Sequence, residues 1–309
     1  MLMLILTMLG CSSSSIEPID GVELTWFGVT SWLVRYEDQS LLIDPFFSRP
    51  QLGVEGSTEA GIQTMNEMLE SAGSSHVNAI LVGHSHFDHA IDVGTAAIEA
   101  NAQVYGSPTT CWIAQSQDLD AERCTTVAQG DTFSLGSATI HTIRTIHWNP
   151  EGFSGTYGEY TEEPDPTAIG WAPNGGTLSF LIEWPETGQS LFIQDSMGPL
   201  NGNDKSSEDY TENLEALFLE RALTTVWLAP ADFVDTSEEI GEYLSRIQPQ
   251  WWLAHHWDGT APDLAAGPPK DFVLPDFISS TAEQYDSTIV LPERYGQQFQ
   301  LTEAGLEAK

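Results

Sequence analysis

The stretch that decides the fold is residues 81–92, LVGHSHFDHAID, which places three of the chain's eight histidines within six residues. His84, His86 and His89 occur there together with Asp88. Imidazole and carboxylate groups are ligands of zinc and similar cations, and a catalytic site takes three protein ligands per metal while leaving a position for water. Because His84 and His86 can point to one side of an irregular loop and Asp88 and His89 to the other, the motif predicts one loop that serves two adjacent metals.

The segments on either side of the motif place it between a strand and a helix. Residues 77–83, VNAILVG, form a short continuous apolar run, as in strands that are buried on both faces of a sheet. Residues 90–102, AIDVGTAAIEANA, form a helical pattern of small residues. Folds of the α/β class carry their chemistry in such loops, at the carboxyl ends of strands.

The rest of the chain consists of runs of strands with helices between them. Residues 22–47 alternate apolar and polar residues around a turn and predict a β-meander. Helices are expected at 61–72, 211–223 and 237–247, and further strands at 102–107, 131–147, 176–184, 190–195, 224–230, 251–256 and 287–291. With no repeat and no linker inside residues 21–309, the pattern predicts one domain of layered sheets with outer helices.

Further metal-ligand residue types stand at the ends of later predicted strands. His147 ends one strand, Asp195 ends another, and the doublet His255 and His256 ends a third. Each lies where a strand meets a loop, so these side chains can join the opening motif at one edge of the layered sheets. Two further histidines are expected to be structural: His76 and His141.

Taken together, these residues resemble the metallo-β-lactamase superfamily, whose signature is H-x-H-x-D-H followed by His, Asp and His on later strands. The similarity extends over nearly the whole mature chain, from residues 24–47, which resemble the family's opening strands, to the closing segment 287–301. The resemblance implies an α/β fold, the αββα four-layer sandwich, with two mixed β-sheets face to face and helices on the outside.

Shorter segments resemble one branch of that superfamily, which contains ascorbate-phosphate lactonase and N-acylphosphatidylethanolamine phospholipase D type enzymes. They are TWFG, LIDPFFS, IHW and HHWDGT. The chain departs from this branch at Val29, where relatives usually carry a histidine, and at Gln194, where they often carry glycine before the aspartate. HWDGT is similar to the family's HWGT, which favours His256 over His255 as the last ligand, and His86 stands where oxygen-reducing relatives carry glutamate.

The resemblance also implies a ligand set and a reaction. Two divalent metal ions are expected, zinc in the first place and manganese or iron as alternatives. The first would be held by His84, His86 and His147, the second by Asp88, His89 and His256, and Asp195 would bridge them. Asp88 and His89 are the expected catalytic residues, with Asp88 as base if one metal is bound, and Asp44 is expected to support the ligands. Water activated by the metals would hydrolyse an ester, lactone, amide or phosphodiester of a small or lipid-like molecule.

Three other functions are weighed against this hydrolase. A serine hydrolase is disfavoured because no G-x-S-x-G occurs and residues 195–198, DSMG, lack the leading glycine. An exported lipoprotein that binds a metal or ligand without turnover is the main alternative, but every expected ligand position is filled. A sheet-on-sheet adhesion module would not need the histidines.

The composition is strongly acidic. There are 45 aspartate and glutamate residues against 10 lysine and arginine residues, a formal net charge of −35. Such a charge repels DNA, RNA and anionic lipid headgroups, so nucleic acid is excluded as an expected partner. Two interpretations remain, a solvated shell suited to salty surroundings and steering of the substrate.

We expect the stability of the protein to rise with ionic strength, because screening weakens the repulsion among these carboxylates. The melting temperature should increase by several degrees between low and molar sodium chloride, since about 1 kcal/mol moves it by about 2–4 °C in domains of comparable size. Differential scanning calorimetry measures this shift. Melts that do not change with salt would contradict the interpretation.

The N-terminus predicts export. Residues 1–10, MLMLILTMLG, form an apolar run too short to span a bilayer, and MLGC resembles the bacterial lipobox, in which the cysteine, here Cys11, is lipidated. Residues 1–20 would then be a lipoprotein signal peptide and serine-rich tether, and 21–309 the hydrolase domain, held at a bacterial membrane (periplasm or cell surface) only through this lipid. The alternative is a frayed hydrophobic tail.

Two more features leave alternatives open. Cys111 and Cys124 can form a disulfide in an oxidising compartment or remain a buried pair of thiols. Residues 148–177 break every periodicity and are rich in glycine, proline and aromatic residues, which is typical of a long functional loop. This loop insertion is expected to be either a lid that faces the substrate or a structural flap.

Overall fold

The computed structural model describes residues 19–50, 56–74, 76–148, 157–202, 209–219, 221, 226–232, 236–260 and 264–309. Signal-peptide and lipid-anchor predictions for residues 1–18, Cys11 included, lie outside these ranges. The first strand begins at Ile19. None of the helices in the described ranges is long and apolar enough to cross a bilayer.

The first sheet has eight strands in the order β15-β14-β1-β2-β3-β4-β5-β6. The meander β1–β3 is antiparallel, as its alternating pattern predicts, and β3 to β6 run parallel to their neighbours. The strands are β1 (Ile19–Gly28), β2 (Ser31–Glu37), β3 (Gln39–Ile43), β4 (Ala79–Leu81), β5 (Gln103–Gly106), β6 (Cys124–Thr126), β14 (Gln297–Thr302) and β15 (Gly305–Ala308).

The second sheet has seven strands in the order β13-β12-β11-β10-β9-β8-β7. Its first four strands are parallel and the remaining pairs are antiparallel, so it is also mixed. The strands are β7 (Thr132–Leu135), β8 (Ala138–Thr145), β9 (Thr177–Trp184), β10 (Gln189–Gln194), β11 (Val226–Pro230), β12 (Trp251–His255) and β13 (Thr288–Val290).

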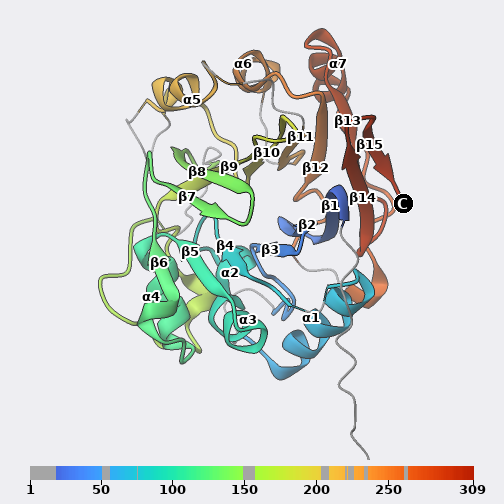
Figure 1. Ribbon diagram of the computed structural model, residues 1–309. Helices are drawn as coiled ribbons and strands as arrows, with labels where there is room; N and C mark the ends of the chain where they lie inside the picture. The colour runs from blue at the N-terminus through green and yellow to red at the C-terminus, as the bar shows by residue number, and fades with distance from the viewer. Residues whose placement is uncertain are drawn as a thin grey trace, which may run out of the picture.

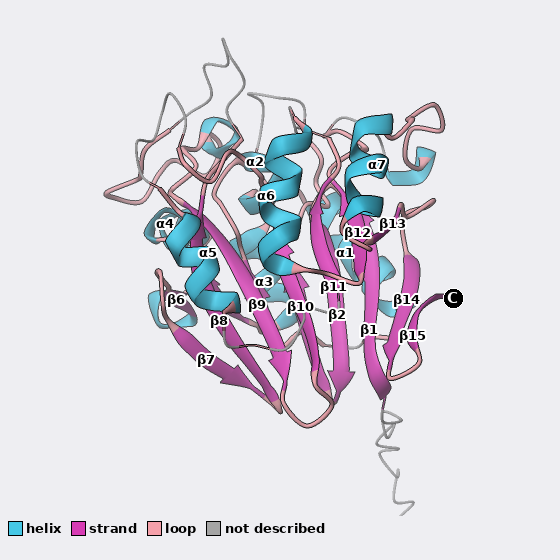
Figure 2. Ribbon diagram, turned by 90° about the horizontal axis from the view of Figure 1, so that it is seen from above, coloured by secondary structure: helices cyan, strands magenta, loops and turns pink. Residues whose placement is uncertain are grey.

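Helices cover the outer face of each sheet (Figure 1). One group of helices packs on the first sheet and another group packs on the second sheet. Figure 2 shows the second group from above. The helices are α1 (Glu59–Ser71), α2 (Phe87–Ala90), α3 (Val93–Ala100), α4 (Pro108–Ser116), α5 (Thr211–Phe218), α6 (Ser237–Ile247) and α7 (Asp276–Gln284), with short 3₁₀ turns at Ala121–Arg123, Ile169–Trp171 and Leu264–Ala266.

Three apolar cores separate the four layers. The central core lies between the sheets and contains Trp26, Trp32 and Phe180, each at most 1% exposed. The others lie under α1, α3 and α4 and under α5, α6 and α7. Neighbouring residues of β1 serve different cores: Trp26 enters the central one and Phe27 the outer one, as the two-residue period of a strand requires. The αββα sandwich is therefore confirmed.

The sequence patterns missed helices α2, α4 and α7 and strands β6 and β15. The closing segment contains a second strand, β14, after the strand expected over 287–291, and the single strand expected over 131–147 is two strands, β7 and β8. α4 begins with Ser107, whose hydroxyl accepts a hydrogen bond from the backbone N–H of Thr110, and with Pro108 in the first turn, a recognisable helix start. The helix expected over 211–223 is wrong at its end, because α5 stops at Phe218 and the side chain of Leu219 is 82% exposed.

Candidate metal centre

The H-x-H-x-D-H motif lies in the loop between β4 and the short helix α2, as the flanking patterns predict. Its backbone is tied at two points: the N–H of Gly83 donates to Asp44 Oδ1 (2.9 Å), and the N–H of Ser85 donates to the carbonyl of Asn174 (2.8 Å). Gly83 is required, since a Cβ there would stand 2.2 Å from Asp195 Oδ2. The loop and the Asp195 carboxylate are therefore packed without space between them.

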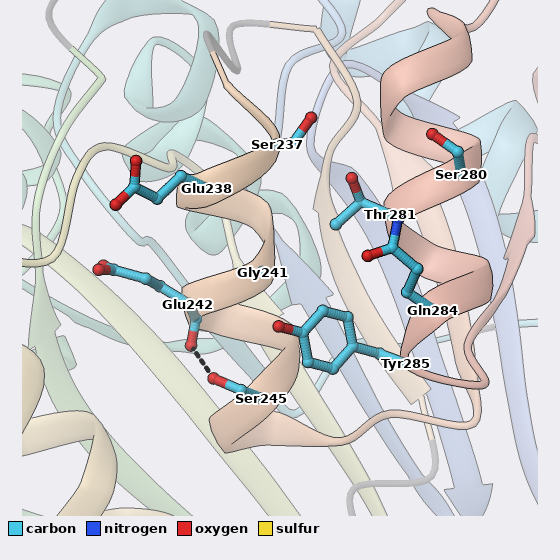
Figure 3. Close-up of a pocket in the computed structure, with 9 residues that line it drawn as sticks. All are labelled: Ser237, Glu238, Gly241, Glu242, Ser245, Ser280, Thr281, Gln284 and Tyr285. Carbon is cyan, nitrogen blue, oxygen red and sulfur yellow. Dashed lines mark hydrogen bonds between the residues drawn. The ribbon is translucent and has the colours of Figure 1, made fainter.

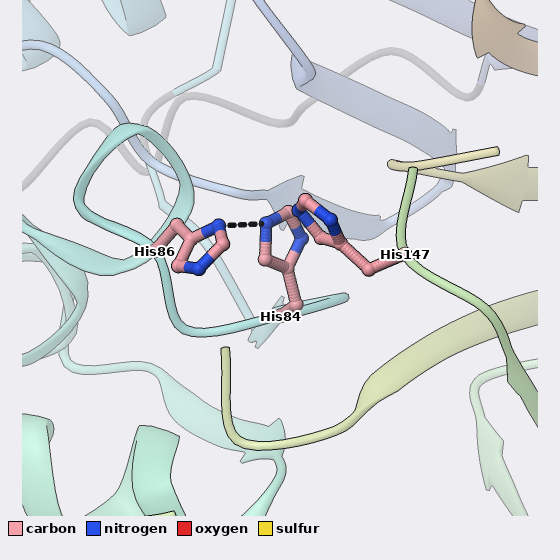
Figure 4. Close-up of side chains that lie close together, drawn as sticks. All are labelled: His84, His86 and His147. Atoms are coloured by element: carbon pink, nitrogen blue, oxygen red, sulfur yellow. Dashed lines mark hydrogen bonds between the residues drawn. The ribbon is translucent and has the colours of Figure 1, made fainter. Parts of the chain in front are cut away.

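Three histidines from two segments form the first cluster. His84 Nε2 and His86 Nδ1 are 3.1 Å apart, and the ring of His147, which follows β8, lies 4.6 Å from that of His84 and 4.7 Å from that of His86. One nitrogen from each falls within 4.8 Å of the others, close enough to share a metal ion. Figure 4 shows the three rings meeting at one point from the β4–α2 loop and the end of β8.

The second cluster combines Asp88 and His89 with His256, which follows β12. Asp88 Oδ2 lies 3.3 Å from His256 Nε2 and 3.6 Å from His89 Nε2. Here too the three ligand atoms lie within 4.8 Å of one another, and all three residues are buried. The sequence-predicted residues therefore come together in the two groups expected from the motif.

Asp195 reaches both clusters from the end of β10. Its Oδ2 lies 2.6 Å from His84 Nδ1 and 3.6 Å from His89 Nδ1. Its Oδ1 is buried and has no hydrogen-bond partner among the described residues. An unpaired carboxylate oxygen in a buried site costs several kcal/mol unless something else compensates it, and a cation would do so.

Hydrogen bonds to one ring nitrogen determine which nitrogen of each histidine is left for a metal. His89 Nδ1 lies 3.0 Å from Asp44 Oδ2 and 2.8 Å from Thr30 Oγ1, and His147 Nδ1 donates to the Trp148 carbonyl. With Asp195 2.6 Å from Nδ1 of His84, oxygen groups face Nδ1 of all three rings, which leaves Nε2 of each ring for a metal. Carboxylates and carbonyls orient metal-ligating histidines in this way.

The ionisation of the cluster also suits a cation. Burial lowers the pKa of His84 well below its usual value and that of His147 to about 3, and the neighbouring imidazoles act in the same direction. Burial would raise the pKa of Asp88, but His89 and His256 outweigh it and hold that pKa below its usual range. Neutral imidazole and ionised carboxylate are the forms that bind metals.

The pKa values of Asp195 and His256 are raised, in contrast to the lowered values of the preceding residues. Burial raises the pKa of Asp195 well above its usual value, and the nearby carboxylates of Asp44 and Asp88 raise it further. Burial alone would lower the pKa of His256, but its contact with Asp88 outweighs this and raises it. The carboxylates of Asp44, Asp88 and Asp195 are therefore crowded together in a buried site, and the described residues fit a resident divalent cation.

The doublet at the end of β12 separates into two roles. His255 is fully buried, its Nδ1 accepts a hydrogen bond from Trp32 Nε1 (3.0 Å) and its Nε2 donates to the Gln194 carbonyl (3.0 Å). Both ring nitrogens are thus taken, and the structure brings His256 instead to the second cluster. His141 pairs with Glu183 at 2.7 Å, His76 lies 3.2 Å from the Asp38 carbonyl, and neither belongs to a cluster.

Part of the 148–177 loop borders the clusters. The ring of Tyr157 lies 5.9 Å from that of His147, its hydroxyl is 3.5 Å from the Trp148 carbonyl, and burial raises its pKa to about 12. The backbone is anchored where Gly175 N–H donates to the Gly158 carbonyl (2.9 Å). Residues 149–156 of the expected lid or flap, with Phe153, lie outside the described ranges.

A groove of about 430 Å³ lies between α6 and α7. It is lined by groups that include Glu238, Glu242, Ser245, Gln284 and Tyr285 (Figure 3). It contains no histidine and none of the clustered residues. Its lining therefore gives no reason to assign it to the candidate metal centre.

Sequence reasoning missed several residues that build the centre. Thr30 contacts His89, Ser196 Oγ accepts from the Trp148 N–H (3.0 Å), and Asp258 binds the turn beside His256. For Thr30 and Ser196 no local pattern was available, because a single hydroxyl near a strand end is common. Asp258 stands inside HHWDGT, so its position next to a ligand was the one usable signal.

Known proteins resemble this chain in both sequence and structure. A family model described as the beta-lactamase superfamily domain matches residues 23–184, just over half of the 309 residues. The chain is 26% identical over 214 residues to a UPF0173 metal-dependent hydrolase of Halobacterium salinarum, covering 67% of this chain and 79% of that protein. It is 25% identical over 185 residues to a UPF0173 metal-dependent hydrolase of Myxococcus xanthus, covering 58% and 54%.

Solved structures show the shared fold at low identity. Unliganded yeast PDE1 matches with a TM-score of 0.58 at 10% identity, covering 92% of this chain and 100% of that one. The metallo-beta-lactamase fold protein YhfI of Bacillus subtilis matches with a TM-score of 0.54 at 14% identity, covering 90% and 99%. The two face-to-face sheets, the clustered histidines and aspartates and these matches together show that the chain belongs to the metallo-β-lactamase superfamily and is a metal-dependent hydrolase.

Proposed function

We propose that the centre holds two divalent cations and hydrolyses an ester, lactone, amide or phosphodiester bond of a small or lipid-like substrate. The observation that carries this is the common orientation of His84, His89 and His147, whose Nδ1 atoms are all tied to oxygen groups so that Nε2 is left for a metal. A structural site would be closed by its ligands, whereas clusters with three protein ligands leave a coordination position for water.

The proposed division of ligands follows the clusters. His84, His86 and His147 would hold one cation, and Asp88, His89 and His256 the other, with Asp195 as a residue that would serve both. When bound, the cations would supply an ionised water at neutral pH and neutralise charge that develops on the substrate. Asp88, kept ionised by His89 and His256, can accept a proton from that water at Oδ2 if one cation is bound.

The exposure of the ligands indicates where substrate enters. His84 and His89 are 1% exposed, whereas His86 and His147 are partly exposed, so the first cluster faces the solvent side. Tyr157 borders that side, with its ring 5.9 Å from the ring of His147. A net charge of −35 disfavours large polyanions, which supports a small or lipid-like substrate of low charge.

The identity of the metal forms part of the same proposal. Zinc suits three-ligand clusters of imidazole and carboxylate, and manganese and iron are the alternatives for these nitrogen and oxygen donors.

Export of the protein with a lipid on Cys11 is proposed from the lipobox-like segment. Its support in the fold is the disulfide between Cys111 of α4 and Cys124 of β6, because disulfides persist in oxidising compartments.

We expect purified protein loaded with zinc to hydrolyse at least one member of a panel of esters, lactones, amides and phosphodiesters. Activity should fall at least about 100-fold after treatment with a chelator and return when the metal is restored, because the chemistry depends on the cation. The control is circular dichroism of the chelated protein, which should remain folded. Tight metal binding without turnover of any compound would favour the alternative, a metal- or ligand-binding protein.

A further inference from the structure

Two hydrogen-bonded residues, one of which belongs to the second cluster, have left-handed backbone conformations. Val29, in the turn between β1 and β2, has φ of 49°, and His256 has φ of 60°. Such conformations cost about 1–3 kcal/mol in residues other than glycine and persist only where the surroundings impose them. The two are joined directly, because the His256 N–H donates to the Val29 carbonyl (3.1 Å). The position of His256 therefore depends on the conformation of this turn.

Asp258 holds the turn in that conformation. Its side chain is fully buried, and both carboxylate oxygens accept the N–H of Val29, at 2.9 and 3.1 Å. Oδ2 also accepts the hydroxyl of Tyr295 (2.8 Å) and lies 3.6 Å from Arg49 Nη1. A Cβ on Gly28 would stand 3.0 Å from the same oxygen, so the carboxylate fills the space beside the turn.

The same turn supports the other histidine of the second cluster. Thr30, the next residue, places its hydroxyl 2.8 Å from His89 Nδ1. Residues 28–30 thus contact His256 through the Val29 backbone and His89 through a side chain. Among the described residues, the hydrogen bonds of this turn reach His89 and His256 and none of the first-cluster histidines His84, His86 and His147.

We propose that Asp258 is the positioning residue of the second metal: by clamping the β1–β2 turn, it sets the places of His89 and His256 and leaves the first cluster unaffected. The inference rests on the proposed two-cation centre. An asparagine would keep the shape of the side chain but would replace one acceptor oxygen with an NH₂ donor. The side chain would then have a single acceptor oxygen for the Val29 N–H and the Tyr295 hydroxyl, which two oxygens now share. Supporting residues of this kind change metal affinity by about 10–100-fold.

The test is a zinc titration of wild type and Asp258→Asn, with each bound equivalent measured by calorimetry and elemental analysis. We expect the second equivalent to bind about 10–100-fold more weakly in the variant and the first to remain within about threefold of wild type. Equal weakening of both, or no weakening of either, would overturn the proposal. Tyr295→Phe removes one donor to the same carboxylate and should give a smaller loss in the same direction, which keeps the test open if Asp258→Asn does not fold.

Asp92→Asn is the matched control. Asp92 is also fully buried, and its Oδ2 accepts two backbone N–H groups, from Phe47 (2.7 Å) and Ser48 (2.8 Å), but it binds the segment before α1 instead of the histidine turn. The Asp92→Asn change should lower the melting temperature without changing the ratio of the two zinc affinities. A selective weakening of the second zinc equivalent in Asp92→Asn would contradict the special role of Asp258.

The titration also separates this inference from the proposed function, because its readout is metal binding. A wild type that takes up two zinc ions but hydrolyses nothing defeats only the proposed function, whereas one that binds a single ion defeats the two-cation premise.

Discussion

Replacing His84 with alanine is expected to reduce hydrolysis by about 10³-fold or more, since loss of a single oxyanion donor already costs about 10²–10³ and this change removes a metal ligand. His84 faces His86 through Nε2 and Asp195 through Nδ1, so its removal opens the first cluster and leaves Asp195 without its hydrogen-bonded neighbour. The variant should also bind less metal. Activity assays and metal analysis of the same preparation measure both effects.

The control for this experiment is another histidine in an ion pair. His141 pairs with Glu183 and lies outside both clusters, so His141→Ala should keep its metal content and activity. Circular dichroism should show that His84→Ala is folded, because the three apolar cores are unchanged. Full activity in folded His84→Ala would exclude the proposed ligand assignment.

The second large effect separates two adjacent histidines. His256→Ala should lose the second metal and most of the activity, because its Nε2 faces Asp88 at 3.3 Å. His255→Ala should instead retain both metals but lose about 2–5 kcal/mol of stability, since it leaves a cavity and deprives Trp32 Nε1 and the Gln194 carbonyl of their partner. Chemical denaturation and metal analysis of the two variants measure this contrast.

A reversed outcome would contradict the structural assignment of the doublet. If His255→Ala lost metal while His256→Ala lost only stability, the two rings would have to exchange roles. His255→Gln, which retains hydrogen-bonding groups, provides a second variant if the alanine change prevents folding. It should recover part of the stability without altering metal content.

Local patterns predicted most of the framework because they depend on neighbours in the chain. The meander β1–β3 shows the alternation of a half-buried sheet, and β4 shows the continuous apolar run of a central strand. Helix α4 was missed because threonine and cysteine are weak helix formers, and burial against the first sheet compensates for them. The Cys111–Cys124 disulfide could not be chosen over free thiols, since spacing alone does not bring two sulfurs together.

The sequence by itself determined the residue types of the candidate ligands and their places near strand ends, since residue identity and strand periodicity are local properties. It also favoured His256 over His255 through the HWDGT segment. Only the tertiary structure decided which ring nitrogen faces each cluster, that both nitrogens of His255 are occupied, and that Asp258 binds the Val29 turn across a separation of 229 residues. These depend on hydrogen bonds between distant segments, whose geometry exists only when the two sheets are packed face to face.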